Sequence, residues 1–221
     1  MPRMMLPPAS PDPSPGPAPR PADQPQDYSL SPLADLLNAL AARQPIPGGG
    51  SAAALNAAIA CALAQMAAAY STGPRYAAHA GRIGQIQHVL AEIRTSLLEA
   101  AVLDQRAYLA LRAAGTSPAA PFIIEAARVP QSVAQGCLNA LQHTADLLRV
   151  GNPHLASDAR AAGRMLHAAG LAALEMVRVN LDALPAQERA AAGLQPDALA
   201  GYLDRALADL LAARPAAAIN P

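Results

Sequence analysis

The fold of this chain is decided by residues 48–70, which read GGGSAAALNAAIACALAQMAAAY. Alanine and leucine dominate after the glycines, and the only polar side chains before the closing tyrosine are Ser51, Asn56 and Gln65. Alanine and leucine are good helix formers, and a helix that is apolar on nearly every side is normally a buried one. The stretch therefore predicts a central buried helix that begins at a Ser51 cap and lets its neighbours approach closely.

A membrane span is the competing interpretation, because the run is about 20 residues long. Its alanine content, its two amides and the lack of a second clear span elsewhere in the sequence favour the core helix. We therefore expect no membrane partner.

The composition of the whole chain agrees with an all-α fold. Hydrophobic residues make up 52% of the 221 residues, but only 3% are aromatic, and aromatic and β-branched residues are the ones that favour strands. The 16 basic residues, all arginine, balance 16 acidic ones, and without a basic stripe nucleic-acid binding is poorly supported. Cys61 and Cys137 lie in separate apolar helical patterns, which indicates buried, reduced thiols in a cytoplasmic protein.

The chain divides into three parts. Residues 1–28 hold many of the 22 prolines and are expected to be a disordered tail rather than a signal peptide. Residues 29–214 form one helical domain, and 215–221 a disordered C-terminus. Breaks at proline and glycine predict about six helices, at 33–40, 51–70, 76–114, 122–150, 154–184 and 197–213. We expect a Ser31 cap before the first, a kink at Pro130 in the fourth, and a bundle overall.

Asp104 is the most informative residue for function. The helix expected over 76–114 has an apolar seam at Ile83, Ile86, Leu90, Ile93 and Leu97. Continued in steps of three and four, the seam reaches Asp104 and then Tyr108, so a carboxylate falls where an apolar side chain is expected. A buried charge costs free energy unless it is paired. Asp104 is therefore a site carboxylate with Tyr108 one turn away, a structural ion pair, or a side chain exposed by a small helix rotation.

Three further positions stay open between a site role and a structural role. Asp158 follows Ser157 near the start of a helix, where acidic residues commonly complement the helix dipole. Asn180 falls on the inner stripe of the same helix and can serve a ligand or tie two helices together. Arg75, beside Tyr76 in the break after the central helix, can pair with a ligand carboxylate or be an ordinary surface arginine.

The glycine motif is the most specific short pattern in the chain. Gly48, Gly49 and Gly50 carry no side chains that would keep a ligand from the backbone, and the helix start after them offers free N–H donors. No Gly-Lys-Ser/Thr follows, so the motif is not a phosphate-binding P-loop. Taken alone, it also fits a plain loop. The five histidines show no ligand spacing, and we expect no metal.

Several blocks of sequence follow one family pattern, in order along the chain. They are PIPGGGS at 45–51, STGPRY at 71–76, LDQRAY at 103–108 and, within 151–181, GN, SDA and VRVNL. Together they resemble the cyclodeaminase/cyclohydrolase family. This family includes the cyclodeaminase domain of formiminotransferase-cyclodeaminase and stand-alone methenyltetrahydrofolate cyclohydrolases.

The resemblance implies an all-helical homodimer with a folate pocket near the glycine motif, no bound cofactor, and a tetrahydrofolate derivative as substrate. It implies Asp104 as the acid/base, with Asp158 orienting the substrate or balancing charge. The implied substrate-binding residues are Gly48, Gly49, Gly50, Ser51, Arg75, Tyr76, Tyr108 and Asn180. Three features depart from the family pattern: Pro74 and Arg75 replace lysines, Met176 replaces a common asparagine, and the segment after Tyr108 is short.

The implied chemistry explains why a carboxylate is needed. Hydrolysis of 5,10-methenyltetrahydrofolate requires a base for the proton of the attacking water, and cyclisation of 5-formiminotetrahydrofolate requires an acid for the departing ammonia. Both require a group that exchanges a proton near a developing cation, and desolvation of Asp104 would favour its protonated form. The sequence does not choose between the two reactions. The alternative is a non-catalytic helical binding or assembly module that retains the fold.

Overall fold

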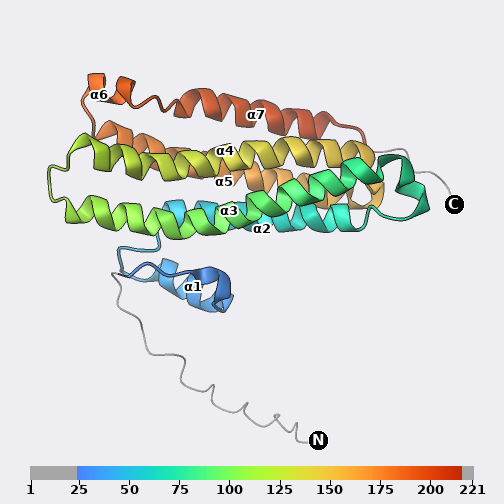
Figure 1. The fold of residues 1–221 in the computed structure, drawn as a ribbon, viewed down its shortest axis with the longest axis horizontal. Coiled ribbons are helices and arrows are strands. Elements are labelled where there is room, and N and C mark those ends of the chain that lie inside the picture. Colours follow the sequence, from blue (N-terminus) through green and yellow to red (C-terminus); the bar gives the residue numbers. More distant parts are fainter. Residues whose placement is uncertain (1–23, 216–221) are drawn as a thin grey trace, which may run out of the picture.

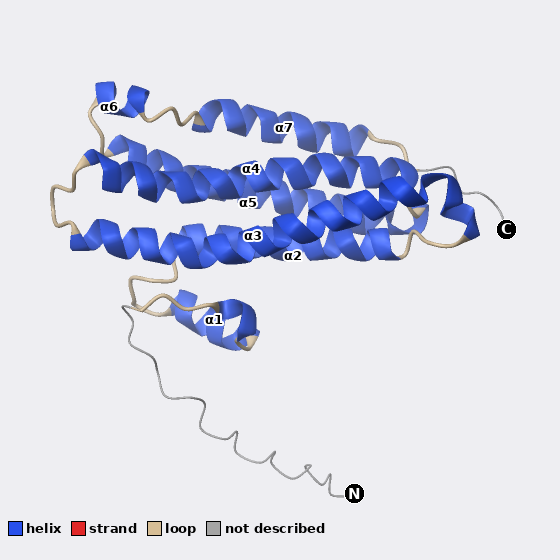
Figure 2. Cartoon of the chain, in the orientation of Figure 1, coloured by secondary structure: helices blue, strands red, loops and turns tan. Residues whose placement is uncertain are grey.

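The computed structural model describes residues 24–215 of the chain. Within them the chain forms seven α-helices, three short 3-10 helices and no strand (Figure 2), which confirms the all-α prediction. The α-helices are α1 (Leu33–Ala41), α2 (Gly49–Ala69), α3 (Ala80–Ala113), α4 (Ala120–Val150), α5 (Ala156–Asp182), α6 (Ala186–Ala191) and α7 (Pro196–Ala212). The 3-10 helices are η1 (Tyr28–Leu30), η2 (Pro74–His79) and η3 (Pro153–Leu155). Most of the predicted tail and the last six residues lie outside the described residues.

Four long helices, α2 to α5, form an up-and-down bundle, and α7 packs against α4 and α5 (Figure 1). Among these four helices, those that follow one another in sequence lie side by side, and α5 closes the bundle against α2. The short helix α1 lies outside the bundle, on the side of α2 and α3. The six-residue α6 is the one α-helix of the described residues that the sequence does not predict.

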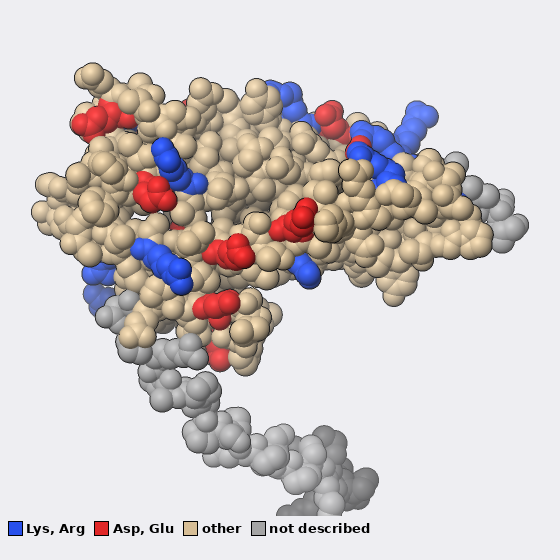
Figure 3. Space-filling view, in the orientation of Figure 1, with Lys and Arg blue, Asp and Glu red and all other residues tan. Residues whose placement is uncertain are grey.

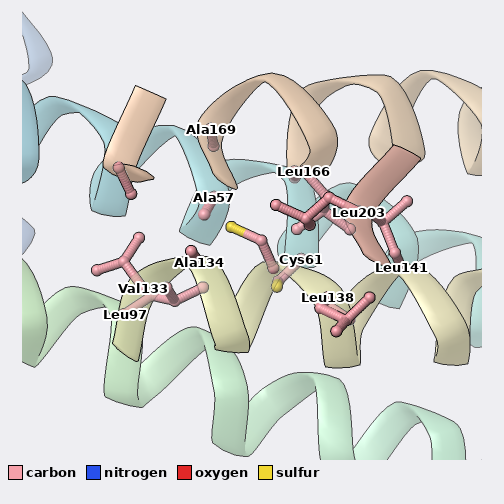
Figure 4. Packing of buried hydrophobic residues seen from close by; sticks show 14 of the residues in the cluster. Ala57, Cys61, Leu97, Val133, Ala134, Leu138, Leu141, Leu166, Ala169 and Leu203 are labelled. Atoms are coloured by element: carbon pink, nitrogen blue, oxygen red, sulfur yellow. The ribbon is translucent and has the colours of Figure 1, made fainter. Parts of the chain in front are cut away.

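The α2 helix is built for close packing on one side. Ala54, Ala57, Cys61 and Ala64 are fully buried, and Figure 4 shows Cys61 among side chains from α4, α5 and α7. Both cysteines are free thiols in this core. The small side chains of α2 leave room for the larger leucines of its neighbours, which fills the interior at normal protein density.

The opposite side of α2 is exposed and apolar. Ile59, Met66 and Tyr70 are 53%, 37% and 65% exposed, and their spacing places them on one face of the helix. Among the described residues, α2 is the one helix long and apolar enough to cross a membrane, with 50% of its most apolar stretch buried in the bundle. The prediction of a helix buried all round is therefore wrong for this face.

Two predicted helix caps are wrong as well. Ser31 ends η1, and α1 begins after Pro32 without a side-chain cap. The α2 helix begins at Gly49 with Gly48 as its N-cap, so Ser51 lies inside the first turn. A cap preference is a local rule, and here the glycine turn sets the start of the helix two residues earlier. The freed Ser51 side chain turns inward, where it is fully buried.

Candidate functional site

Asp104 and Ser51 meet where α2 begins and α3 nears its end. The Ser51 hydroxyl lies 2.9 Å from Oδ2 of Asp104 and 3.0 Å from the backbone oxygen of Ala101. The two helices run in opposite directions, which places the first turn of α2 beside the last turns of α3. The inward carboxylate that the seam predicts is therefore present, and its neighbours are the Ser51 hydroxyl and Gly50 rather than a basic side chain.

The glycine motif makes room for this carboxylate. A side chain at Gly50 would place its Cβ 2.0 Å from Oδ1 of Asp104, so the backbone and the carboxylate touch only because Gly50 has none. At Gly49 the same atom would lie 3.1 Å from the sulfur of Met176. Gly48 has open space around it. Met176, the position where the family commonly has asparagine, thus lies over the glycine turn.

Burial raises the pKa of the Asp104 carboxyl, while hydrogen bonds from the Ser51 hydroxyl and backbone N–H oppose that rise. The Ser51 hydroxyl carries one proton and has two oxygens within reach. It can donate to an ionised Asp104, or donate to Ala101 and accept from a protonated Asp104. The arrangement accommodates both protonation states of the carboxyl without moving a heavy atom, which is what an acid/base group needs.

Asp104 also takes the place of a missing helix cap. The first turn of α2 has N–H groups without helical partners, and Gly48 offers no side chain to them. The Ser51 N–H faces the Asp104 carboxyl closely enough to oppose the rise in its pKa, so a residue distant in sequence lies where a cap of α2 would be. This structural role and an acid/base role are compatible, and their separation requires a measurement.

Asn180 ties two helices together. Pro130, inside α4, has no N–H to offer the carbonyl of Ala126 one turn earlier. The Asn180 side chain donates to that oxygen at 3.0 Å. The structure therefore shows the second of the two possible roles for this amide, because a donor from α5 satisfies the carbonyl that proline leaves free in α4. Tyr108, one turn beyond Asp104, is 42% exposed.

Three of the predicted site residues lie at the other end of the bundle. Arg75 and Tyr76 follow the C-terminal end of α2, about 30 Å from the glycine motif at 1.5 Å per residue. Arg75 is exposed and lies over the Tyr76 ring, 5.6 Å from its centroid. Asp158 is in the first turn of α5, about 27 Å along that helix from Met176. One chain does not bring these residues to Asp104.

The motif residues at the end of the bundle near Arg75 form a hydrogen-bond network. The Ser71 hydroxyl donates to Ala67 and accepts from the Asn152 N–H, both at 2.8 Å. The Asn152 amide donates to the Tyr70 carbonyl at 3.1 Å. A side chain at Gly151 would meet the Ser71 hydroxyl at 2.9 Å. These contacts join the end of α2 to the turn between α4 and α5, which gives that block of the sequence pattern a packing role.

Gln105 is a residue that the sequence does not single out. It is 1% exposed, and its amide bonds to both the N–H and the carbonyl of Gln26 at 3.0 Å. Gln26 belongs to the segment predicted to be a tail, so the ordered chain begins earlier than expected. The one sequence signal for Gln105 is that a polar residue stands next to Asp104. That signal does not reveal its partner, Gln26, which is 79 residues away.

No three His, Cys, Asp or Glu side chains in the described part of the chain lie together as metal ligands would. A pocket of about 670 Å³ between α5, α6 and α7 is lined by Arg178, Asp182, Arg189 and Asp197. These four pair with one another, Arg178 with Asp197 and Arg189 with Asp182, both at 3.0 Å. On the face in Figure 3, acidic and basic side chains are interspersed. The pocket therefore offers no free charge to an ionic ligand.

An up-and-down helical bundle with a carboxylate set against the glycine-rich start of its central helix defines the class of this protein. A sequence model of formiminotransferase-cyclodeaminase matches residues 32–195, and the chain belongs to that family. Among solved structures, a formiminotetrahydrofolate cyclodeaminase from Thermotoga maritima has the same fold, with a TM-score of 0.78 at 24% identity over 83% of this chain and 95% of that one. No curated protein sequence matches the chain.

Proposed function

We propose that this chain is a folate-dependent one-carbon enzyme in which Asp104 is the acid/base. The observation that carries the proposal is the Asp104–Ser51 pair at the glycine turn. The carboxyl is desolvated, its pKa is raised, and its hydroxyl neighbour serves it in either protonation state. Family membership and the name of the Thermotoga relative supply the substrate class, a tetrahydrofolate that carries a one-carbon group.

Two reactions fit this site, and the proposal covers both. In hydrolysis of 5,10-methenyltetrahydrofolate, ionised Asp104 takes a proton from the water that attacks the cationic amidinium carbon. In cyclisation of 5-formiminotetrahydrofolate, the substrate nitrogen outside the pterin ring attacks the formimino carbon, and its proton passes to the formimino nitrogen. Protonated Asp104 then protonates the resulting amino group, which leaves as ammonia. The raised pKa of Asp104 favours the protonated carboxyl that cyclisation needs at its start. Once the cationic product develops, its charge favours an ionised carboxylate.

The decisive test is turnover of both substrates by the purified chain. We expect loss of the methenyl chromophore, or ammonia release from the formimino substrate, faster than in buffer. Asp104→Asn should lower kcat about 10²- to 10⁴-fold, the usual contribution of a general acid/base. Glu99→Gln, an exposed carboxylate on the same helix, is the matched control and should keep wild-type kcat. If the wild-type protein accelerates neither reaction, the proposed enzymatic function is refuted, and the alternative of a non-catalytic binding or assembly module is left.

We further propose that the active form is a homodimer paired through the exposed face of α2. This face carries no charge along the entire helix, and Ile59, Met66 and Tyr70 stand on it largely exposed. In the described residues Asp104 forms no ion pair at one end, and Arg75 forms none at the other. Antiparallel pairing of two α2 helices would bring opposite charges together at each end.

Such a pairing also explains how residues about 30 Å apart in one chain can serve one substrate. Each site would take the glycine turn and Asp104 from one copy and Arg75 from the other. In that arrangement Arg75 is placed to hold a carboxylate of the folate glutamate tail in a fork geometry. Asp158 lies at the same end of the bundle as Arg75 and would enter from the partner copy as well.

A further inference from the structure

Two separate points of the chain before α3 contact adjacent residues of α3. Gln26 is bonded to Gln105, and Gly50 and Ser51 touch Asp104. Residues 26–50 therefore form a loop with both ends attached to one turn of α3. We refer to residues 26–48, which include η1 and α1, as the N-terminal loop. It begins and ends beside the proposed acid/base.

The first attachment is a complete set of hydrogen bonds around one buried amide. Gln105 Oε1 accepts from the Gln26 N–H at 3.0 Å, and its Nε2 donates to the Gln26 carbonyl at 3.0 Å and to the Ala101 carbonyl at 3.1 Å. Both amide hydrogens and the amide oxygen are in use, as a buried amide requires. The Gln26 side chain donates in turn to the Ser31 hydroxyl at 3.2 Å, which extends the attachment to the residues before α1.

The part of the N-terminal loop that follows Gln26 buries few side chains. The α1 helix lies outside the bundle in Figure 1. Leu30, Leu33 and Leu37 are 90%, 62% and 55% exposed, and Leu36 is the one buried side chain of α1. The loop is also buried at its far end, where Ile46 is 4% exposed. Its first part, residues 26–35, has no buried apolar side chain, and such a segment opens at low cost unless specific bonds hold it. The Gln105 amide is therefore the main tether at its start.

We propose that Gln105 is a positioning residue that holds the N-terminal loop beside the glycine turn, where the loop forms a wall of the substrate site. This inference rests on the proposed function. Gln105 does not reach the reacting atoms, since its amide is fully occupied by Gln26 and Ala101. Its effect is on substrate binding, because the loop contributes a surface and the chemical group is the neighbouring Asp104.

The test compares Gln105→Leu with wild type by amide hydrogen exchange and by steady-state kinetics. We expect exchange at residues 26–31 to speed up about tenfold or more, because loss of the two bonds to Gln26 makes local opening easier. KM should rise roughly fivefold or more, with kcat within about twofold, as for lost uniform binding. Gln85→Leu, a substitution of an exposed glutamine on α3, is the matched control and should change neither.

A second pair of variants leaves α3 untouched. Gln26→Pro removes the N–H that bonds to Gln105 and should reproduce the effect on KM. Gln26→Ala keeps both backbone groups and should stay near wild type. The inference is overturned if amide exchange at residues 26–31 becomes faster in both Gln105→Leu and Gln26→Pro while KM is unchanged. It is also overturned if neither variant changes that exchange. A wild type without turnover removes the proposed function and this inference with it, whereas an active wild type with unaffected variants removes this inference alone.

Discussion

At the scale of single residues, Gly48 and Gly50 of the glycine motif differ in the space around them. Gly50→Ala places a Cβ 2.0 Å from Oδ1 of Asp104, whereas Gly48→Ala meets nothing within 4 Å. Helix propensity alone predicts that alanine at Gly50 is stabilising by about 1 kcal/mol. The overlap outweighs it, because forced repacking costs about 1–3 kcal/mol.

We therefore expect Gly50→Ala to lower the free energy of unfolding and, by displacing Asp104, to lower kcat about 10²-fold. Gly48→Ala should stay within about 0.5 kcal/mol of wild type. Urea denaturation and the turnover assay together check both. Equal stability of the two variants would show that Asp104 moves aside freely and is not held against the turn.

Asp104 predicts a pH dependence of stability with a definite sign. Burial raises its pKa in the folded state above the unfolded value of about 3.9. A raised acid pKa contributes stability below the unfolded pKa, and this is lost as the pH rises through the folded pKa. Asp104→Asn does not titrate, so its stability relative to wild type should increase from about pH 4 upward and then level off.

Urea denaturation from pH 4 to pH 8 measures this difference. Glu99→Gln, at an exposed carboxylate on the same helix, should give a nearly flat difference over the same range. If the advantage of Asp104→Asn grows on acidification instead, the carboxylate is stabilised by folding and its hydrogen bonds with Ser51 outweigh its desolvation.

At the scale of helices, the packing of α4 against α5 depends on a proline and an amide. Asn180 donates to the carbonyl of Ala126, which lacks a helical donor because residue 130 is proline. Asn180→Ala should cost about 1–2 kcal/mol, the range for a buried carbonyl left without its partner. The same substitution at Asn139, an exposed position on α4, should cost little.

A double-mutant cycle isolates the pair. In Pro130→Ala the backbone N–H returns and Ala126 regains a donor within α4, so Asn180→Ala should cost almost nothing in that background. The expected coupling is about 1 kcal/mol, measured by chemical denaturation of the four proteins. Additive effects would mean that Asn180 stabilises the bundle by packing and not through this carbonyl.

The helical elements themselves follow closely from local patterns. The seam of α3 predicts its buried side chains, and Ile83, Ile86, Leu90 and Leu97 are all at most 3% exposed. Helix ends are less predictable: the expected start of α3 forms η2, and Ser31 and Ser51 do not cap. Ends depend on which distant groups lie beside the free N–H and carbonyl groups, as Asp104 lies beside the first turn of α2, and local sequence does not contain that information.

At the scale of the whole molecule, the proposed dimer has a direct test. Ile59→Glu with Met66→Glu places charges on the exposed face of α2, and we expect the chain to become monomeric in size-exclusion chromatography with light scattering. Each copy would bury two carboxylates in an apolar interface, which costs several kcal/mol. Val179→Glu, at an exposed apolar residue on α5 (65% exposed), is the control and should leave the mass unchanged.

Complementation tests the shared site. Asp104→Asn and an Arg75→Ala variant should each be impaired, and after dissociation and mixing about a quarter of wild-type activity should return, because half the dimers are mixed and each has one intact site. A wild-type chain that is monomeric and fully active, or a mixture that recovers nothing, contradicts the composite site. Mass that changes only in detergent would indicate that a lipid surface covers this face of α2.

The sequence by itself determined the all-helical class, the number and approximate positions of the long helices, the inward stripe of α3 and the family of the chain. These depend on helix propensity, periodicity and short motifs, all of which act over a few residues. Only the tertiary structure decided that Gly50 and Ser51 meet Asp104, that Asn180 serves Ala126, and that Gln105 holds Gln26. It also placed Arg75 and Asp158 at the far end of the bundle. Such pairings depend on how antiparallel helices align their ends, which no local pattern specifies.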